Sequence, residues 1–265
     1  MINATRSELV RIRRKGVIIG WLGLIVLFVA MINMVIVQVV SESSAPPAGA
    51  PGVSFPVLAE LRSPEGLVAG LSSAASMLGV VTLSFWAIAT ASDYSTGLIR
   101  ILASAEPNRV RLLSGKITAL TAWTAAASTV ALVANLVIAP VAARAGDIDV
   151  SAWGQGLVPT LAGAWTNLFC TLLVWGVIGL ALAVVTRSAA ISIAVGVGYV
   201  LVVESVITAA ADTIADWMPG KTLSALAQGG TTDIPYATAL ALGVAYTAIG
   251  VGIAFTIFQR RDITD

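Results

Sequence analysis

Six long, nearly uncharged stretches constrain the fold of this chain more than any other feature. A helix that crosses a bilayer needs about 20 predominantly apolar residues, and lipid-exposed backbone must satisfy its hydrogen bonds within its own segment. Each stretch is long enough, so we expect an all-α integral membrane protein with six transmembrane helices in a single domain over residues 1–265. The expected spans are approximately 17–41, 66–92, 117–143, 159–186, 188–211 and 234–259.

Composition supports this class and limits the chemistry. Charged residues make up 11% of the chain, against about 25% in soluble domains, and the mean hydropathy is +0.92. There is no histidine, which excludes Ser-His hydrolases, HExxH metalloproteases and histidine proton relays. The single cysteine, Cys170, allows no intramolecular disulfide. We therefore expect no enzymatic activity, no metal site and no nucleic-acid partner.

No nucleotide-binding loop is recognisable either. A P-loop requires GxxxxGK[ST] after a strand. The one GKT triplet, Gly220-Lys221-Thr222, has Ala215 where the first glycine belongs. We therefore expect no cofactor in this chain, and any ATP and Mg to be bound by a separate subunit.

The basic residues lie mostly on one side of the expected spans. With the N-terminus in the cytoplasm, the outer segments hold only Arg62, Arg144 and Lys221 of the 15 basic residues. The positive-inside rule favours this orientation, with both termini cytoplasmic. We expect a multi-pass protein of the plasma membrane, here the inner membrane of a bacterium.

Three connecting segments have patterns of their own. Residues 4–16, ATRSELVRIRRKG, mix apolar and basic side chains, which favours an N-terminal amphipathic helix on the membrane surface over a plain basic tail. Residues 42–65 hold five prolines and predict an irregular outer loop. Residues 212–235 are half apolar but broken by glycine and proline, which predicts a helical hairpin in the outer leaflet.

Residues 92–116, between the second and third spans, contain four basic and two acidic side chains. Four apolar residues follow the i, i+3, i+4, i+7 spacing of one helix face: Leu98, Ile101, Leu102 and Ala105. Pro107 should end this helix, and Asn108 can cap the next one. A solvated inner loop would show the same charges, but the apolar stripe favours an amphipathic helix that faces lipid or a partner protein.

The order of residues in this segment is informative. An acidic residue, a glycine beside a threonine, a short hydrophobic helix, a proline with a nearby arginine, and a Gly-Lys follow one another. This order resembles the cytoplasmic segment of ABC-2-type ABC transporter permeases. Two positions depart from that pattern, because Asp93 replaces the usual glutamate and Thr96-Gly97 inverts the usual Gly-Thr. The six-span layout extends the resemblance over most of the chain, whereas the motif covers residues 92–116 only.

The resemblance implies a permease subunit of an ABC exporter with a coupling helix over residues 98–105 that docks into a cytoplasmic ATPase subunit. Gly97 would allow a sharp turn, and Asp93, Arg100 and Arg109 would form salt bridges within the chain or to the ATPase. The coupling residues would be Asp93, Gly97, Leu98, Arg100, Ile101, Leu102, Ala105, Pro107, Arg109 and Lys116. It also implies a second permease subunit, in a homodimer or heterodimer surrounded by membrane lipids, and export of a drug, peptide or lipid-like amphiphile.

Glu204 is the one ionisable residue inside an expected span. A charge within the bilayer is costly, so Glu204 is a candidate for lining the translocation path or anchoring the outer hairpin, unless it snorkels to the outer interface. Two other function classes stay open. An ion-gradient-driven secondary transporter would have Glu204 as its only intramembrane carboxylate, and a non-transporting assembly or sensor subunit would need none.

Overall fold

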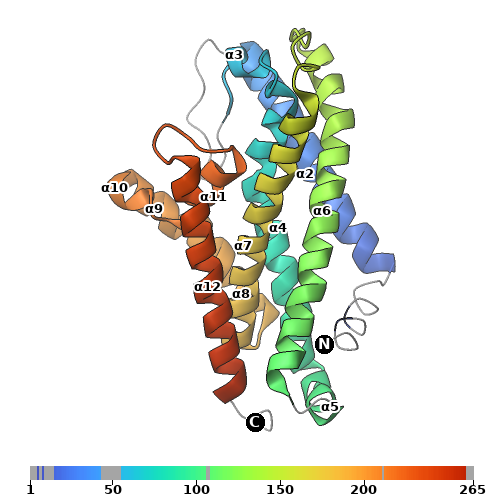
Figure 1. Ribbon diagram of the computed structural model, residues 1–265, viewed down its shortest axis with the longest axis vertical. Coiled ribbons are helices and arrows are strands. Elements are labelled where there is room, and N and C mark those ends of the chain that lie inside the picture. The colour runs from blue at the N-terminus through green and yellow to red at the C-terminus, as the bar shows by residue number, and fades with distance from the viewer. Residues whose placement is uncertain are drawn as a thin grey trace.

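The computed structural model describes Thr5, Glu8 and residues 15–42, 55–105, 108–210 and 212–260. All regular structure in these residues is helical, and six segments are long and apolar enough to cross a membrane (Figure 1). The prediction of an all-α, multi-pass membrane protein is confirmed. The six segments are Lys15–Val40, Gly66–Ser95, Arg109–Ala145, Leu157–Thr186, Ala189–Thr208 and Tyr236–Arg260. Most of the expected amphipathic helix over residues 4–16, and Pro107, lie outside the described residues.

The third membrane helix, α6 (Arg109–Ala145), begins well before the predicted residue 117. Its 37 residues rise about 55 Å at 1.5 Å per residue, more than the hydrocarbon core of about 30 Å requires. The extra turns lie at its charged N-terminus, where uncharged runs give no signal. As predicted, Asn108 caps this helix, because its side chain accepts a hydrogen bond from the Arg111 N–H at 3.1 Å.

The fifth span is not the continuous α-helix that its sequence predicts. It consists of α8 (Ala189–Gly198), one π-helical turn (Tyr199–Val203) and α9 (Glu204–Ala210). A π-turn inserts one residue into the helical hydrogen-bond pattern and often marks a functional position. Here it immediately precedes Glu204, and α9 then leads away from the bundle to the short helix α10 (Asp212–Ala215) (Figure 1).

The centre of the bundle is formed by α4 (Gly66–Ser95) and α7 (Leu157–Thr186), the two most buried spans. Each helix places a tryptophan against a glycine of the other, Trp86 against Gly176 and Trp175 against Gly79. A Cβ atom at either glycine would overlap the indole ring. Without an apolar driving force between helices in lipid, such close packing of large on small residues holds the pair together.

Helix α2 (Lys15–Glu42) is tied to this centre by buried amides. Asn33 Nδ2 donates to Asn135 Oδ1 of α6 at 3.0 Å, and Asn135 Nδ2 donates to the Leu67 carbonyl oxygen of α4 at 2.8 Å. Each interhelical hydrogen bond of this kind contributes about 0.6 kcal/mol in a membrane. The two bonds join three spans at one level of the bundle.

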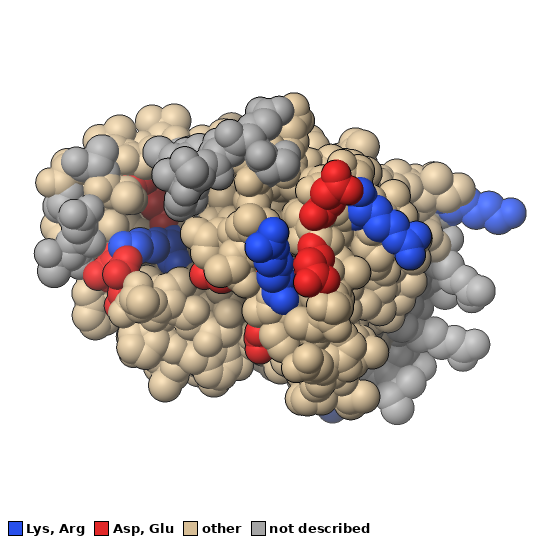
Figure 2. All heavy atoms as spheres, turned by 90° about the horizontal axis from the view of Figure 1, so that it is seen from above, with Lys and Arg blue, Asp and Glu red and all other residues tan. Residues whose placement is uncertain are grey.

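Short helices mark the two ends of the bundle (Figure 1). Helix α5 (Leu98–Ala105) lies at one end, next to the start of α6, and its Ile99 belongs to the same apolar cluster as Phe258 in the last turn of α12 (Tyr236–Arg260). Helix α3 (Leu58–Leu61) lies at the other end, and we call these the α5 end and the α3 end. On the α3 end, acidic and basic side chains are interspersed over a largely uncharged surface (Figure 2).

Candidate functional site: the α5 end and the Glu204 anchor

Helix α5 is a separate element between α4 and α6, with the bounds that the sequence predicts for a coupling helix. The chain turns into it at Gly97, whose φ of +67° lies in the left-handed region that favours glycine. Arg100 and Ala105 lie within the helix. The hydrogen bonds from Thr96 N–H and Gly97 N–H back to Ser92 and Tyr94 close the end of α4 just before this turn.

The side chains of α5 divide differently from the predicted stripe. Ile99, which the stripe leaves out, is buried and packs in a cluster with Leu113 and Phe258. Leu98 and Leu102 are half-buried, whereas Ile101 is 65% exposed. A helix of two turns with six aliphatic or alanine side chains has two apolar sides, and spacing alone cannot tell which one meets the bundle. An exposed isoleucine remains available for contact at the α5 end.

Asp93 and Lys116, both singled out from the sequence, form a buried ion pair. Lys116 Nζ lies 2.7 Å from Asp93 Oδ2, and the two side chains are 8% and 1% exposed. The same Nζ lies 3.1 Å from Glu8 Oε2 and donates to the Ala89 carbonyl oxygen at 3.1 Å. The pair therefore joins the end of α4 to the start of α6, on either side of α5.

Glu8 is a member of this network that the sequence did not single out. It is an acidic residue among five basic ones in residues 4–16, which was the only signal that it has a specific partner. Its carboxylate is 8% exposed and lies 108 residues from Lys116 in the chain. Together with Ile88, Leu98 and Ile101 it lines a cavity of about 520 Å³ between α2, α4 and α5.

Arg109 faces the bundle. Its Nη1 donates to the carbonyl oxygens of Phe258 at 3.2 Å and of Gln259 at 3.1 Å. These carbonyls belong to the last turn of α12, where a cation is favourable because the helix dipole leaves partial negative charge there. Arg109 thus ties the start of α6 to the end of α12, a contact that no sequence pattern indicates.

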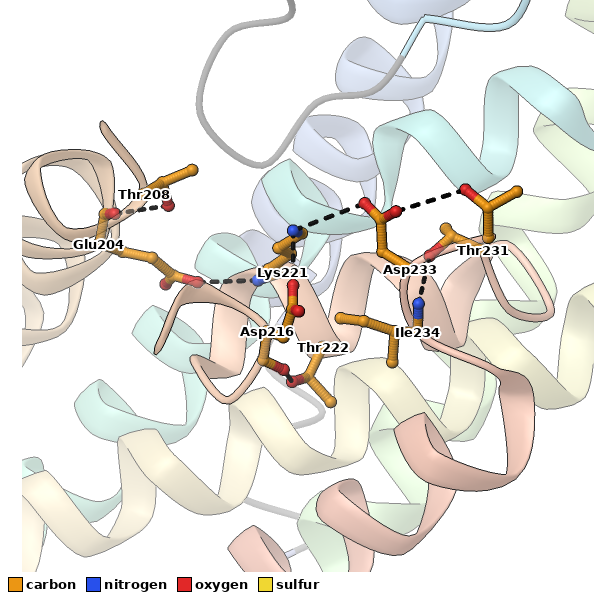
Figure 3. A network of polar contacts seen from close by, with 9 residues as sticks. Glu204, Thr208, Asp216, Lys221, Thr222, Thr231, Asp233 and Ile234 are labelled. Carbon is orange, nitrogen blue, oxygen red and sulfur yellow. Dashed lines mark hydrogen bonds and ion pairs between the residues drawn. The ribbon is translucent and has the colours of Figure 1, made fainter. Parts of the chain in front are cut away.

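The structure brings the second candidate, Glu204, to the N-terminus of helix α11 (Pro219–Ala227) (Figure 3). Glu204 is 6% exposed. Its Oε2 accepts from the Gly220 N–H at 3.1 Å and its Oε1 from the Lys221 N–H at 2.7 Å. Helix N-termini bind anions through free N–H groups and the helix dipole. The negative charge of the Glu204 carboxylate is therefore compensated by backbone N–H groups of the Gly220-Lys221-Thr222 triplet.

The segment around α11 is folded rather than extended. Lys221 Nζ donates to Asp216 Oδ1 at 2.6 Å and lies 3.6 Å from Asp233 Oδ2 (Figure 3). The hydrogen bond with Asp216 raises the pKa of Lys221 above its ordinary value. Leu223 and Leu226 of α11 are buried in a cluster that includes residues of α4 and α7. The sequence predicts a helical hairpin over residues 212–235, and in this segment the structure shows two short helices, α10 and α11.

These observations give two distinct sites. Asp93 and Lys116 flank α5 at the α5 end, whereas Glu204 begins α9 and contacts α11, and Figure 1 shows α9 and α11 well away from α5. In the part of the chain that the structure describes, no group of three or more Asp, Glu, Cys or His side chains could hold a metal ion. No known family model matches this sequence, and a search of curated proteins finds no significant match.

Proposed function

We propose that this chain is the membrane-spanning permease subunit of an ABC-2-type exporter, powered by a separate cytoplasmic ATPase that binds ATP and Mg. One observation carries the proposal. A separate two-turn helix, α5, lies between the second and third spans in the segment that resembles the coupling element of that family, and it presents Ile101 to the surroundings. The uneven distribution of basic residues supports a cytoplasmic position for this end.

The contacts around α5 supply a route for mechanical coupling. Helix α5 is connected through Gly97 to α4 and packs through Ile99 on the cluster that contains Leu113. The Asp93–Lys116 pair joins the two flanking helices, so a force on α5 acts on α4 and α6 together. Closure of an ATPase on ATP would displace α5, and α4 would carry the displacement to its partner α7 in the centre of the bundle.

The proposal is tested by recovery of the ATPase. The tagged full chain is purified from its own cells in mild detergent, and a co-purifying subunit with Walker motifs and ATP hydrolysis is expected. Ile101→Asp places a charge on the exposed apolar contact and should lower ATPase recovery at least tenfold. Val110→Asp is the matched control, because Val110 is an exposed aliphatic residue at the same end but outside α5. It should leave recovery unchanged.

Two outcomes contradict the proposal. Equal ATPase recovery with Ile101→Asp and Val110→Asp would show that α5 is not the element that docks into the ATPase. Transport that continues after loss of the ATPase, and stops when the proton gradient is dissipated, would instead identify an ion-gradient-driven transporter. The two backbone hydrogen bonds to Glu204 give that residue a structural role and do not require proton coupling.

A further inference from the structure

A large cavity opens at the α3 end, and its lining includes none of Asp93, Lys116 and Glu204. Its volume is about 970 Å³, at the upper end of the range for small-molecule sites. Its two long walls are the first turns of α4, from Glu65 to Ser73, and of α7, down to Asn167. The end of α11, at Ala227 and Gln228, also lines it. We call this cavity the α3-end cleft.

The charge of the α3-end cleft is one-sided. Its lining includes two carboxylates, Glu60 and Glu65, and contains no lysine or arginine among the described residues. Glu60 Oε2 accepts from the Val57 N–H at 3.1 Å, and Glu65 Oε2 lies 3.0 Å from the Ser63 hydroxyl, whose single hydrogen is shared with the Glu60 carbonyl oxygen at 2.7 Å. The N-termini of α4 and α7 also reach the cleft, but about half a positive charge each offsets only part of two formal charges.

The nearest basic residue in the sequence, Arg62, is not part of the lining. It interacts electrostatically with Asp149, and the Ser151 N–H and hydroxyl together with Arg62 hold the pKa of that carboxyl below its ordinary value. Arg62 therefore does not neutralise Glu60 and Glu65 from within the lining. A ligand with a positively charged group would interact most favourably with these two carboxylates.

The side chains that line the α3-end cleft are mostly small, and they include both apolar and polar groups. Apolar contacts come from Val68, Ala69, Pro159 and Ala164, and the polar groups between them are hydroxyls and amides without charge, such as Ser72, Thr160 and Asn167. Apolar lining with a few placed polar groups is typical of sites for small amphipathic molecules. Gly163 keeps part of the wall open, because a Cβ atom there would meet nothing within 4 Å.

We propose that the α3-end cleft binds a lipophilic cation, with the charged group between Glu60 and Glu65 and the apolar body along α4 and α7. This inference rests on the proposed transport function, for which the cleft would be the exit side of the pathway. It narrows the substrate to amphipathic molecules that carry a positive charge.

The test uses the full chain in nanodiscs of phosphatidylcholine, which carries no net charge, with no ATPase present. The probe is radiolabelled tetraphenylphosphonium, measured by equilibrium dialysis with empty nanodiscs subtracted. We expect one saturable site per chain. Neutral triphenylphosphine oxide, which has similar aryl groups, should compete at least tenfold more weakly. Higher salt should weaken binding of the cation, because both lining carboxylates, Glu60 and Glu65, are exposed to solvent.

Variants assign the binding to the α3-end cleft. The combined change Glu60→Gln and Glu65→Gln keeps shape and should weaken binding about tenfold, since each exposed charge contributes up to about fivefold. Gly163→Phe fills open space and should abolish binding, with monodisperse gel filtration as the folding control. Asp147→Asn should bind as the unchanged chain does, because Asp147 is exposed, lies outside the cleft and has a φ of 52° that asparagine tolerates.

Absence of saturable binding overturns the inference, as does equal competition by triphenylphosphine oxide or unchanged affinity in the double glutamine variant. The assay contains no ATPase, so its result is independent of the docking test. If the chain binds the cation but no ATPase co-purifies, the cation site is supported and the exporter proposal is rejected. If an ATPase co-purifies but the cation does not bind, the exporter proposal is supported and the cation site is rejected.

Discussion

At the scale of single residues, the buried carboxylate of Glu204 depends on its contact with the backbone of α11. Glu204 lies directly after the π-turn of the fifth span, and both of its oxygens accept backbone N–H groups of α11. A carboxylate that accepts such bonds does not require a basic side chain to compensate it. The close approach depends on Gly220, where a Cβ atom would lie 2.5 Å from Glu204 Oε2.

Gly220→Ala should therefore destabilise the protein by about 2 kcal/mol, because the Glu204 carboxylate must withdraw from at least one backbone hydrogen bond. Thermal unfolding in detergent, followed by loss of the monodisperse gel-filtration peak, measures the change. Gly198→Ala is the matched control in the neighbouring helix α8, where a Cβ atom meets nothing within 4 Å. It should leave stability unchanged or raise it by up to about 1 kcal/mol. Equal effects of the two changes would contradict the anchoring role of Glu204.

Helices and their junctions form the next scale, and the junction of α4, α5 and α6 depends on one buried cation. Lys116 is 8% exposed and lies within 3.1 Å of carboxylates of Asp93 and Glu8. Two buried carboxylates around one ammonium group form a network that is costly to open. The network joins the last turns of α4 to the first turns of α6, and α5 is the segment of chain between these two helices.

Lys116→Met should cost about 3–5 kcal/mol of stability, because it removes the buried ammonium group that lies between the carboxylates of Asp93 and Glu8. Adding Asp93→Asn to this variant should restore part of the loss, since one of the two buried negative charges that faced the ammonium group is then removed. Thermal unfolding of the single and double variants gives the coupling between the two side chains as a double-mutant cycle. Strictly additive losses would show that the pair does not join α4 to α6.

The elements could be predicted from the sequence to the extent that composition encodes them. Uncharged runs locate all six spans, and the cap at Asn108 and the helix over residues 98–105 follow from local patterns. The π-turn could not be predicted, because Tyr199–Val203 has the composition of any apolar helix. Contacts between distant residues, such as Glu8 with Lys116 or Arg109 with the end of α12, depend on packing that one sequence does not display.

The whole molecule has a dense centre and an apolar periphery. Helices α4 and α7 interlock through tryptophans and glycines, whereas the outer helices α2 and α12 expose aliphatic side chains, among them Ile19, Leu27, Val244 and Ile249. In water such a surface would aggregate, and in a bilayer it is matched by lipid chains. The charged ends of the bundle therefore decide how the molecule is oriented in the membrane.

The orientation can be tested because the chain has a single cysteine, Cys170, which Cys170→Ala removes. In that background, Ser104→Cys places an exposed thiol on α5, and Ser151→Cys places one in the exposed segment before α7. The positive-inside bias predicts that a membrane-impermeant maleimide labels Ser151→Cys in intact cells and Ser104→Cys only in inverted vesicles. The unsubstituted background should label in neither. The reverse pattern would put α5 outside the cell, out of reach of any cytoplasmic ATPase, and would place the α3-end cleft on the cytoplasmic side.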